Sequence, residues 1–269
     1  MDIISLTGVV LGLVGVFVGM VVKGVPFSAI LNPAAALIIF VGTAGAVCIA
    51  TPASRIKNVG KLLGIIFGEK KSIAKHEIIE FLVHFSEIAR REGLLALEKE
   101  VKDIEDPFMK RGFIMVIDGA NSDFLEDALM EDITSMEERH AANAQIFAQA
   151  GMYSPTLGVL GAVIGLIAAL GNINDTTALG HAISAAFMAT MFGIFSGYVI
   201  FHPFSNKLKQ KSMIEVETKK LILKGILTIQ LGENPRILRE KLYSCLSATE
   251  RGKLLGSGSK GSETTDGEK

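Results

Sequence analysis

Four long segments of this chain contain no Asp, Glu, Lys or Arg, and this feature limits the possible folds more than any other. They lie near residues 3–22, 34–52, 148–170 and 178–203. A helix needs roughly 20 mainly apolar residues to cross the hydrocarbon core of a bilayer, and each segment is about this long. We therefore predict an all-α polytopic membrane protein with four transmembrane helices and a helical cytoplasmic domain.

Basic residues indicate the orientation of these helices. If the four segments alternate across the bilayer, every Lys and Arg except Lys23 lies on one side. Basic residues in short flanking loops stay in the cytoplasm, so we expect a multi-pass protein of the cytoplasmic (inner) membrane with both termini inside. The first segment follows Met1-Asp2 rather than a basic stretch, which favours a retained helix over a signal peptide.

The region between the second and third segments is expected to be helical. Its apolar residues recur at three- and four-residue spacing, with an interruption at Gly93. A helix that opens at Ser122 meets no Pro or Gly before Gly151, so we expect it to run close to or into the third membrane segment. The expected parts of the chain are 1–54, transmembrane helices one and two; 55–140, a cytoplasmic helical insert; 141–206, transmembrane helices three and four; 207–255, cytoplasmic tail helices; and 256–269, a disordered end without apolar side chains.

The membrane segments lack a carboxylate that could carry a proton. Hydroxyl groups do not ionise at useful pH, and His181 and His202 fall at expected helix ends, where an imidazole is usually solvated. If the protein moves ions, a partner must supply the acid. Cys48 and Cys245 fall in different environments, so no disulfide is expected.

Enzyme and cofactor motifs are also missing from the sequence. There is no phosphate-binding loop, dinucleotide fingerprint, metal-ligand cluster or catalytic-triad spacing. A net charge of −1 gives no reason to expect nucleic acid as a partner. We therefore expect a protein that is not an enzyme and has no cofactor.

Small and helix-bending residues mark the membrane segments. Pairs of the GxxxG type, which permit close packing within one subunit or between subunits, occur at Gly8–Gly12, Gly15–Gly19, Gly161–Gly165 and Gly193–Gly197. Pro155 and Pro203 both fall near the inner face, where each can bend its helix or simply end it.

The insert contains one distinctive charged stretch. Arg90 and Glu98 are eight residues apart, about two helical turns if the helix continues through Gly93. Taken alone, such charges indicate only a solvated helix face.

Several of these stretches resemble the MotA family, whose members are four-helix subunits of the bacterial flagellar stator. The resemblance covers about residues 1–245. Its motifs are Ala-Arg-Arg-Glu-Gly-Leu-Leu-Ala-Leu-Glu at 89–98, Ser-Pro-Thr-Leu-Gly-Val-Leu-Gly-Ala-Val-Ile-Gly-Leu at 154–166, Ala-Thr-Met-Phe-Gly at 189–193, His-Pro-Phe-Ser-Asn-Lys-Leu at 202–208 and Gly-Glu-Asn-Pro-Arg at 232–236.

The resemblance implies partners and residue roles. MotA-like subunits surround a MotB-type partner whose single span carries the proton-accepting Asp, in an arrangement of five copies around two partners. Arg90 and Glu98 correspond to family residues that engage the rotor protein FliG, and Arg236 of the tail motif is assigned to the same contact. Pro155 and Pro203 correspond to prolines that couple ion passage to movement.

The same resemblance favours protons over sodium. Sodium-driven relatives look like Gly-Thr-Leu-Val-Gly in helix three and Thr-Thr-Leu-Tyr-Gly in helix four, whereas this chain has Ala162 and Ala189 and keeps only Thr190. Because sodium must exchange its water for several oxygen ligands, fewer hydroxyls favour a proton path. We assign Thr156, Ala162 and Thr190 to this path; alternatively, Thr190 bonds to a carbonyl of its own helix.

Other functions remain open at this point. An ExbB/TolQ-like energiser of another envelope process would have three spans and no Arg90–Glu98 motif. A self-contained transporter or channel would need an ionisable residue within a span. A sodium-driven stator and a purely structural scaffold are the remaining alternatives.

Overall fold

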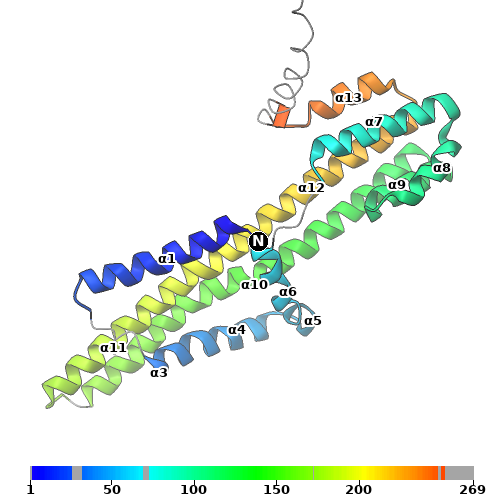
Figure 1. Ribbon diagram of the computed structural model, residues 1–269. Coiled ribbons are helices and arrows are strands. Elements are labelled where there is room, and N and C mark those ends of the chain that lie inside the picture. Colours follow the sequence, from blue (N-terminus) through cyan, green and yellow to red (C-terminus); the bar gives the residue numbers. More distant parts are fainter. Residues whose placement is uncertain (1, 26–31, 69–72, 172, 248–249, 252–269) are drawn as a thin grey trace, which may run out of the picture. The chain divides into compact units, whose positions relative to one another are not determined.

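The computed structural model describes residues 2–25, 32–68, 73–171, 173–247 and 250–251, and this part of the chain contains helices and no strands (Figure 1). The all-α prediction is therefore confirmed. The expected disordered end at 256–269 lies outside the described residues. In chain order the elements are α1 (Ile3–Val22), α3 (Pro33–Ala36), the π-turn η1 (Leu37–Val41), α4 (Gly42–Ala50), α5 (Ala53–Ile56), α6 (Val59–Phe67), α7 (Lys75–Glu92), the 3₁₀ turn η2 (Leu94–Ala96), α8 (Leu97–Glu100), the 3₁₀ turn η3 (Val101–Asp103), α9 (Pro107–Ile117), α10 (Ser122–Leu170), α11 (Thr176–Phe195), the π-turn η4 (Ser196–Phe201), α12 (His202–Gln230) and α13 (Pro235–Tyr243).

The chain divides into two compact units. The first unit consists of Met1–Lys70 and Glu138–Ser212, and the second of Lys71–Glu137 and Met213–Lys269. Helices α10 and α12 each contribute residues to both units.

The first unit holds the membrane helices. Four helical stretches are long and apolar enough to cross a bilayer: Ile3–Val22, Pro33–Ala50, and parts of Ser122–Leu170 and Thr176–Gln230. Large apolar side chains on these stretches are exposed, as lipid contact requires; examples are Val10, Phe40, Leu160, Ile167 and Phe187. The predicted four-span membrane protein is therefore confirmed.

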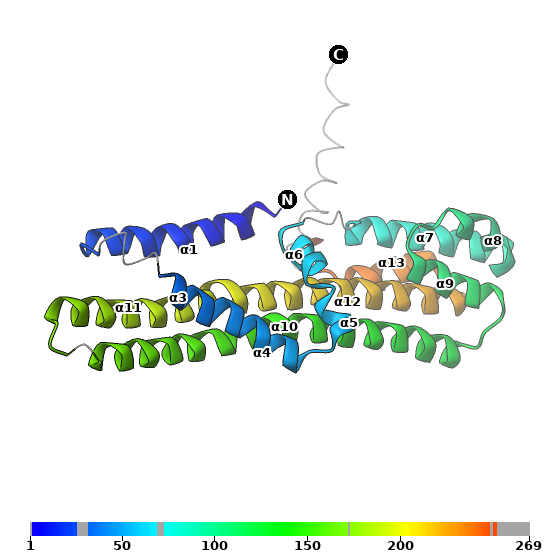
Figure 2. The ribbon, with the colours of Figure 1, turned by 90° about the horizontal axis from the view of Figure 1, so that it is seen from below.

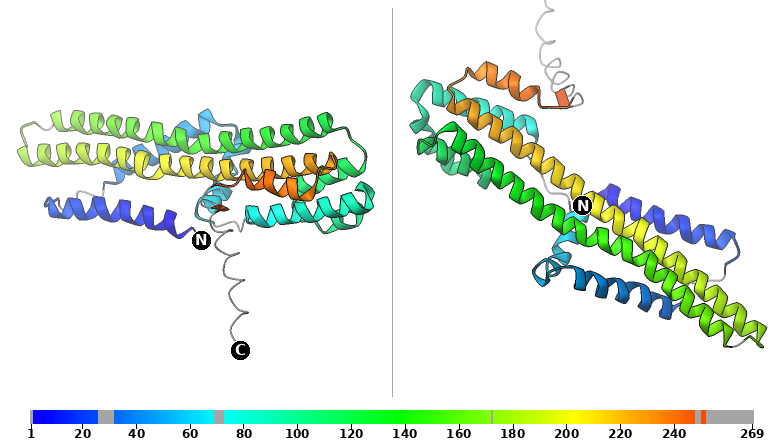
Figure 3. Two further views of the ribbon diagram at one scale, coloured as in Figure 1. Left: turned by 90° about the horizontal axis from the view of Figure 1, so that it is seen from above. Right: turned by 180° about the vertical axis from the view of Figure 1, so that it is seen from behind.

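Helix α10 is a single helix of 49 residues. At 1.5 Å per residue it is roughly 74 Å long, which exceeds the roughly 30 Å hydrocarbon core of a bilayer. The expectation that the helix from Ser122 runs into the third membrane segment is confirmed. Figures 2 and 3 show α11 running alongside α10.

Short polar motifs start several helices. The Asp106 carboxylate accepts a hydrogen bond from the Met109 amide at 2.8 Å, and Pro107 occupies the first turn of α9. Asp175 accepts hydrogen bonds from the Thr177 and Ala178 amides at the start of α11. These are N-cap contacts, which satisfy amides that have no partner within the helix.

The second unit has the larger apolar core, to which α7, α9, α10, α12 and α13 contribute. The rings of Phe85 and Phe113 lie 4.7 Å apart in its centre, and both side chains are fully buried. Gly225 permits α12 to approach α7, because a Cβ there would lie 2.5 Å from Leu82 Cδ1. This packing explains the three- and four-residue spacing of apolar residues in the insert.

Two features of the helices differ from the sequence-based picture. The helix that carries Arg90 does not continue through Gly93, which has a φ of 86°, so Glu98 belongs to the separate helix α8. The expected end of the fourth membrane helix near Pro203 is wrong, because helical structure continues as α12 to Gln230. Pro203 directly follows the π-turn η4 inside a helical run that continues to Gln230.

Candidate functional site

The first candidate site is the seam between α10 and the run formed by α11 and η4. At Gly158 a Cβ would lie 2.9 Å from the Ala189 carbonyl oxygen, and at Gly193 a Cβ would lie 2.7 Å from the Ser154 carbonyl oxygen. Gly161 is nearly as close to Ala189, since its Cβ would lie 3.3 Å from that side chain. The two backbones therefore touch, which is how small residues associate helices in a bilayer.

Pro155 lies within this seam and inside α10, so it does not end a helix. Its ring nitrogen cannot donate to the Gly151 carbonyl, which an α-helix would otherwise bond. Gly197 of η4 faces this place: a Cβ there would lie 2.8 Å from the Gly151 oxygen and 2.8 Å from Pro155 Cγ. Only a glycine fits beside the freed carbonyl without a shift of the backbone.

Pro203 and His202 follow the π-turn η4. The Pro203 side chain is exposed, and its nitrogen cannot donate to the Val199 carbonyl. The His202 ring packs flat against Gly151, because a Cβ there would lie 2.9 Å from three ring atoms. His202 is therefore half-buried within a continuous helical run rather than solvated at a helix end.

The residues assigned to the ion path are not brought together by direct contacts. The exposed Thr156 donates to the Met152 carbonyl at 3.3 Å, and the half-buried Thr190 donates to the Ala186 carbonyl at 3.4 Å. Ala162 is half-buried. The alternative role for Thr190, a bond within its own helix, is thus the contact observed, although its oxygen keeps lone pairs that can still accept a hydrogen bond.

Sequence reasoning did not assign a role to two serines in the seam. Ser154 and Ser196 are fully buried, at 0% and 1% exposure, and their hydroxyl oxygens lie 2.5 Å apart. The sequence shows each as a polar residue in an apolar segment, but nothing along the chain indicates that the two meet.

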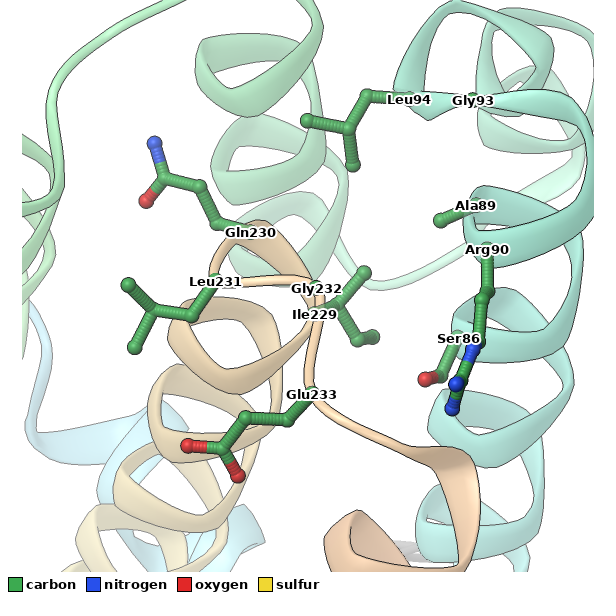
Figure 4. Close-up of a pocket in the computed structure, with 10 residues that line it drawn as sticks. All are labelled: Ser86, Ala89, Arg90, Gly93, Leu94, Ile229, Gln230, Leu231, Gly232 and Glu233. Atoms are coloured by element: carbon green, nitrogen blue, oxygen red, sulfur yellow. The ribbon is translucent and has the colours of Figure 1, made fainter.

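The second candidate site is a charged surface on the second unit. Arg90, Glu98 and Arg236 are all exposed. Arg90 lies in a groove of about 250 Å³ between the end of α7 and the turn after α12 (Figure 4). The lining residues are Ser86, Ala89, Arg90, Gly93, Leu94, Ile229, Gln230, Leu231, Gly232 and Glu233.

A second groove of about 440 Å³ contains Arg236, together with Val83 and Glu87 of α7. Helix α7 thus contributes to both grooves, and the motif at 232–236 supplies residues to each. The structure places Arg90 and the tail motif on one surface, whereas Glu98 on α8 lines neither groove.

The charges of this surface are only partly paired. Glu80 bonds Arg239 at 2.7 Å, and Glu233 lies 3.3 Å from the Lys241 ammonium group. Within the part of the chain that the structure describes, Arg90, Glu98 and Arg236 form no ion pair. These three residues are therefore available to a partner that carries complementary charges.

Tyr243 joins α13 to α7 beside this surface. Its hydroxyl donates to the Glu80 carboxylate at 2.8 Å. Burial, followed by this contact with Glu80, raises the pKa of Tyr243 above its usual value of 10.0. The phenol therefore remains a neutral donor at physiological pH and keeps the C-terminal end of α13 close to α7.

Comparison with known proteins gives consistent matches over the whole chain. The profile of the MotA/TolQ/ExbB proton channel family matches residues 100–220, and the motility protein A N-terminal profile matches residues 6–93. Motility protein A of Bacillus subtilis is 49% identical over 269 residues, which is 100% of this chain and 98% of that protein.

Solved structures agree with the sequence matches. The flagellar MotAB stator complex of Bacillus subtilis contains a chain with a TM-score of 0.88 and 50% identity, over 93% of this chain and 98% of that one. The MotAB structure of C. jejuni gives a TM-score of 0.87 at 33% identity, over 92% and 97% of the two chains.

Proposed function

This chain belongs to the motility protein A (MotA) family of the MotA/TolQ/ExbB proton channels, and we propose on this premise that it is a flagellar motor stator subunit that couples proton flow across the membrane to torque on the rotor. The observation that carries the proposal is the 49% identity to a motility protein A over the entire chain. A subunit of a proton channel is not an enzyme, in agreement with the lack of catalytic motifs.

The acid that carries the proton comes from a second protein. The stator structures that resemble this chain are described as MotAB complexes, which supports a MotB-type single-span partner that carries the proton-accepting Asp. We propose that five copies of this chain surround two such partners in the cytoplasmic membrane, with both termini of this chain in the cytoplasm. Because the membrane segments of this chain contain no charged residue, the partner's carboxylate is needed to carry the proton across the membrane.

The seam and the charged surface have different parts in this mechanism. A proton that crosses 100 mV releases roughly 2.3 kcal/mol. Protonation neutralises the partner's Asp and changes its fit against α10 and α11, where Pro155 and Pro203 permit a change of shape. Arg90, Glu98 and Arg236 then act on FliG through complementary charge, which favours fast and reversible contact over tight binding.

The proposed ion is the proton rather than sodium. Ala162 and Ala189 supply no side-chain oxygen ligand, and the Thr190 hydroxyl donates to its own helix. A sodium ion in this low-dielectric path would lack the ligands that replace its water. A proton needs only the partner's carboxylate and one group to receive it.

The experiment uses tethered cells that lack their own stator genes. We expect rotation when this chain is expressed with a MotB-type partner, and none when it is expressed alone. Rotation should persist at fixed pH when potassium replaces sodium, and it should stop when a protonophore is added. Rotation that needs sodium and survives the protonophore would contradict the proton assignment.

An energiser of the ExbB/TolQ type is the second candidate, because the family profile over residues 100–220 includes such proteins. The match of the motility protein A profile to residues 6–93 favours the stator. Failure of the chain to restore rotation with any MotB-type partner would support the energiser instead.

A further inference from the structure

We propose that Ser154 and Ser196 are positioning residues of the coupling seam. Their hydroxyl pair holds α10 in register with the run formed by α11 and η4, at the level where both backbones lack α-helical hydrogen bonds. The inference rests on the proposed function, because the seam is assigned to coupling on that basis.

The pair is enclosed by backbone carbonyls. The Ser196 hydroxyl lies 2.7 Å from the Phe192 carbonyl oxygen and 3.2 Å from that of Gly193. The Ser154 hydroxyl lies 3.3 Å from the same Gly193 oxygen. Neither side chain is exposed to solvent, so both protons must be donated within this cluster.

Two arrangements of the protons satisfy the cluster. In the first, Ser154 donates to the Ser196 oxygen and Ser196 donates to the Phe192 carbonyl. In the second, Ser196 donates to the Ser154 oxygen and Ser154 donates to the Gly193 carbonyl. The shorter distance to Phe192 favours the first. Both arrangements keep the bond between the two helices.

The backbone around the pair explains why a side-chain bond is needed there. Pro155 removes the donor for the Gly151 carbonyl, and Pro203 removes the donor for the Val199 carbonyl. Ser196 begins the π-turn η4, and its hydroxyl bonds the carbonyl four residues earlier, a contact that bends helices. Between the two prolines, the serine pair is a buried polar contact that joins α10 to η4.

Loss of the serine pair should reduce the torque that each stator unit delivers more than it reduces assembly of the stator. The glycine contacts at Gly158 and Gly193 remain in such a variant, so the helices still associate. A hydrogen bond between membrane helices changes an equilibrium by a factor of roughly 3 on average. We therefore expect assembled stators in which each unit delivers roughly one third of the torque.

The test measures torque for each stator unit separately from the number of units. In tethered cells expressing this chain with its MotB-type partner, stators join a motor one at a time, and the size of each speed step reports the torque of one unit. The variants are Ser154→Ala, Ser196→Ala and the double variant, with Ser184→Ala as the matched control because Ser184 is an exposed serine of α11. Co-purification with the partner reports assembly.

We expect both single variants to assemble and to give speed steps about threefold smaller than wild type. The speed steps of the double variant should be no smaller than those of either single variant. Ser184→Ala should give wild-type steps. Wild-type steps in either single variant, or losses that multiply in the double variant, would overturn the inference. If the alanine variants do not assemble, Ser154→Cys and Ser196→Cys, which replace each hydroxyl with a somewhat larger thiol that is a weaker donor, are held to the same expectations.

The wild-type chain separates this inference from the proposed function. If the wild type with its partner produces no rotation, the stator proposal fails. If the wild type rotates and the single serine variants give unchanged steps, only the positioning role fails.

Discussion

At the scale of single residues, the seam depends on glycines, which have no side chain, and on Pro155, whose backbone nitrogen has no hydrogen to donate. Gly158 and Gly193 let the two backbones touch, and Gly197 fits beside the carbonyl that Pro155 leaves free. Any larger side chain at these positions meets backbone atoms, which cannot move aside as a flexible side chain can.

Gly158→Ala should separate the helices, because the new Cβ would lie 2.9 Å from the Ala189 carbonyl oxygen. We expect a loss of about 1–3 kcal/mol in the free energy of unfolding, as for overpacked sites, together with lost rotation. Thermal unfolding of the purified protein in detergent measures the first effect, and tethered-cell rotation the second.

The matched control is Gly180→Ala, since a Cβ at this exposed glycine of α11 meets no atom within 4 Å. It should leave both measurements at wild-type values or slightly raise the unfolding temperature. Equal effects of the two substitutions would show that close approach at Gly158 is unimportant.

Pro155→Ala restores an N–H group that can donate to the Gly151 carbonyl. A straighter α10 should then fit less well against Gly197, which packs on the proline ring. We expect stators that assemble with their partner but turn the motor weakly, most clearly at high load. Wild-type torque at every load would contradict a role of Pro155 in coupling.

At the scale of helices, the charged surface depends on where helices end. Gly93 ends α7 just after Arg90, and the turn after α12 brings Glu233 and its neighbours to the same groove. Arg90 and Glu98 therefore sit on different helices, α7 and α8, instead of two turns apart on one. A partner that contacts both must follow the bend of the chain at Gly93.

Arg90→Glu combined with Glu98→Lys reverses the two charges without removing a buried contact, because both side chains are exposed. We expect the protein to remain in the membrane with its partner while swimming is abolished. Co-purification with the partner measures the first outcome, and swimming in soft agar measures the second.

The control for this variant is Lys99→Glu together with Glu100→Lys, which reverses two exposed neighbouring charges on α8. It should swim normally. Normal swimming of the Arg90 and Glu98 double variant in low-salt medium, where exposed charges are least screened, would remove the rotor assignment from these residues.

At the scale of the whole chain, the N-terminus is tied to parts of the first unit that are distant in sequence. The Asp2 amide donates to the Phe67 carbonyl at 2.8 Å, and the Asp2 carboxylate lies 2.5 Å from the Lys207 ammonium group. The hydrogen bond with Lys207 lowers the pKa of Asp2 from 3.8 to about 2. These contacts connect α1, α6 and α12 just outside the apolar run of α1.

This depressed pKa gives a pH-dependent stability with a defined sign. The contribution of the Asp2–Lys207 pair is complete above the ordinary value of 3.8 and is lost as the pH falls through about 2. Asp2→Asn should therefore lower the unfolding temperature of the detergent-solubilised protein near neutral pH. The difference from wild type should shrink as the pH falls towards 2 and disappear below it; an undiminished difference at pH 2 would contradict the assigned pair.

Much of this architecture could be predicted from sequence, because it depends on local composition. Uninterrupted apolar runs identify the four spans, and the lack of Pro or Gly between Ser122 and Gly151 predicts the long helix α10. Family motifs, rather than local composition, indicated the candidate residues Arg90, Glu98, Pro155 and Pro203.

Other features depend on contacts between distant parts of the chain. Ser154 meets Ser196, and Arg90 shares a groove with Glu233, only because helices pack side by side. The continuation of the helix past Pro203 was missed for a different reason. A proline usually signals the end of a helix, but here Pro203 lies inside a helical run that passes from the π-turn η4 into α12.

The two cysteines provide a labelling scheme without further engineering. Cys48 and Cys245 are the only cysteines of the chain, and both are exposed and unpaired. Cys48 lies on a membrane-spanning helix, whereas Cys245 lies in the second unit beside Lys224. A water-soluble maleimide dye should therefore react with Cys245 and leave Cys48 to a lipid-soluble reagent. One wild-type protein could thus carry separate fluorescent reporters for the membrane-spanning helices and for the second unit.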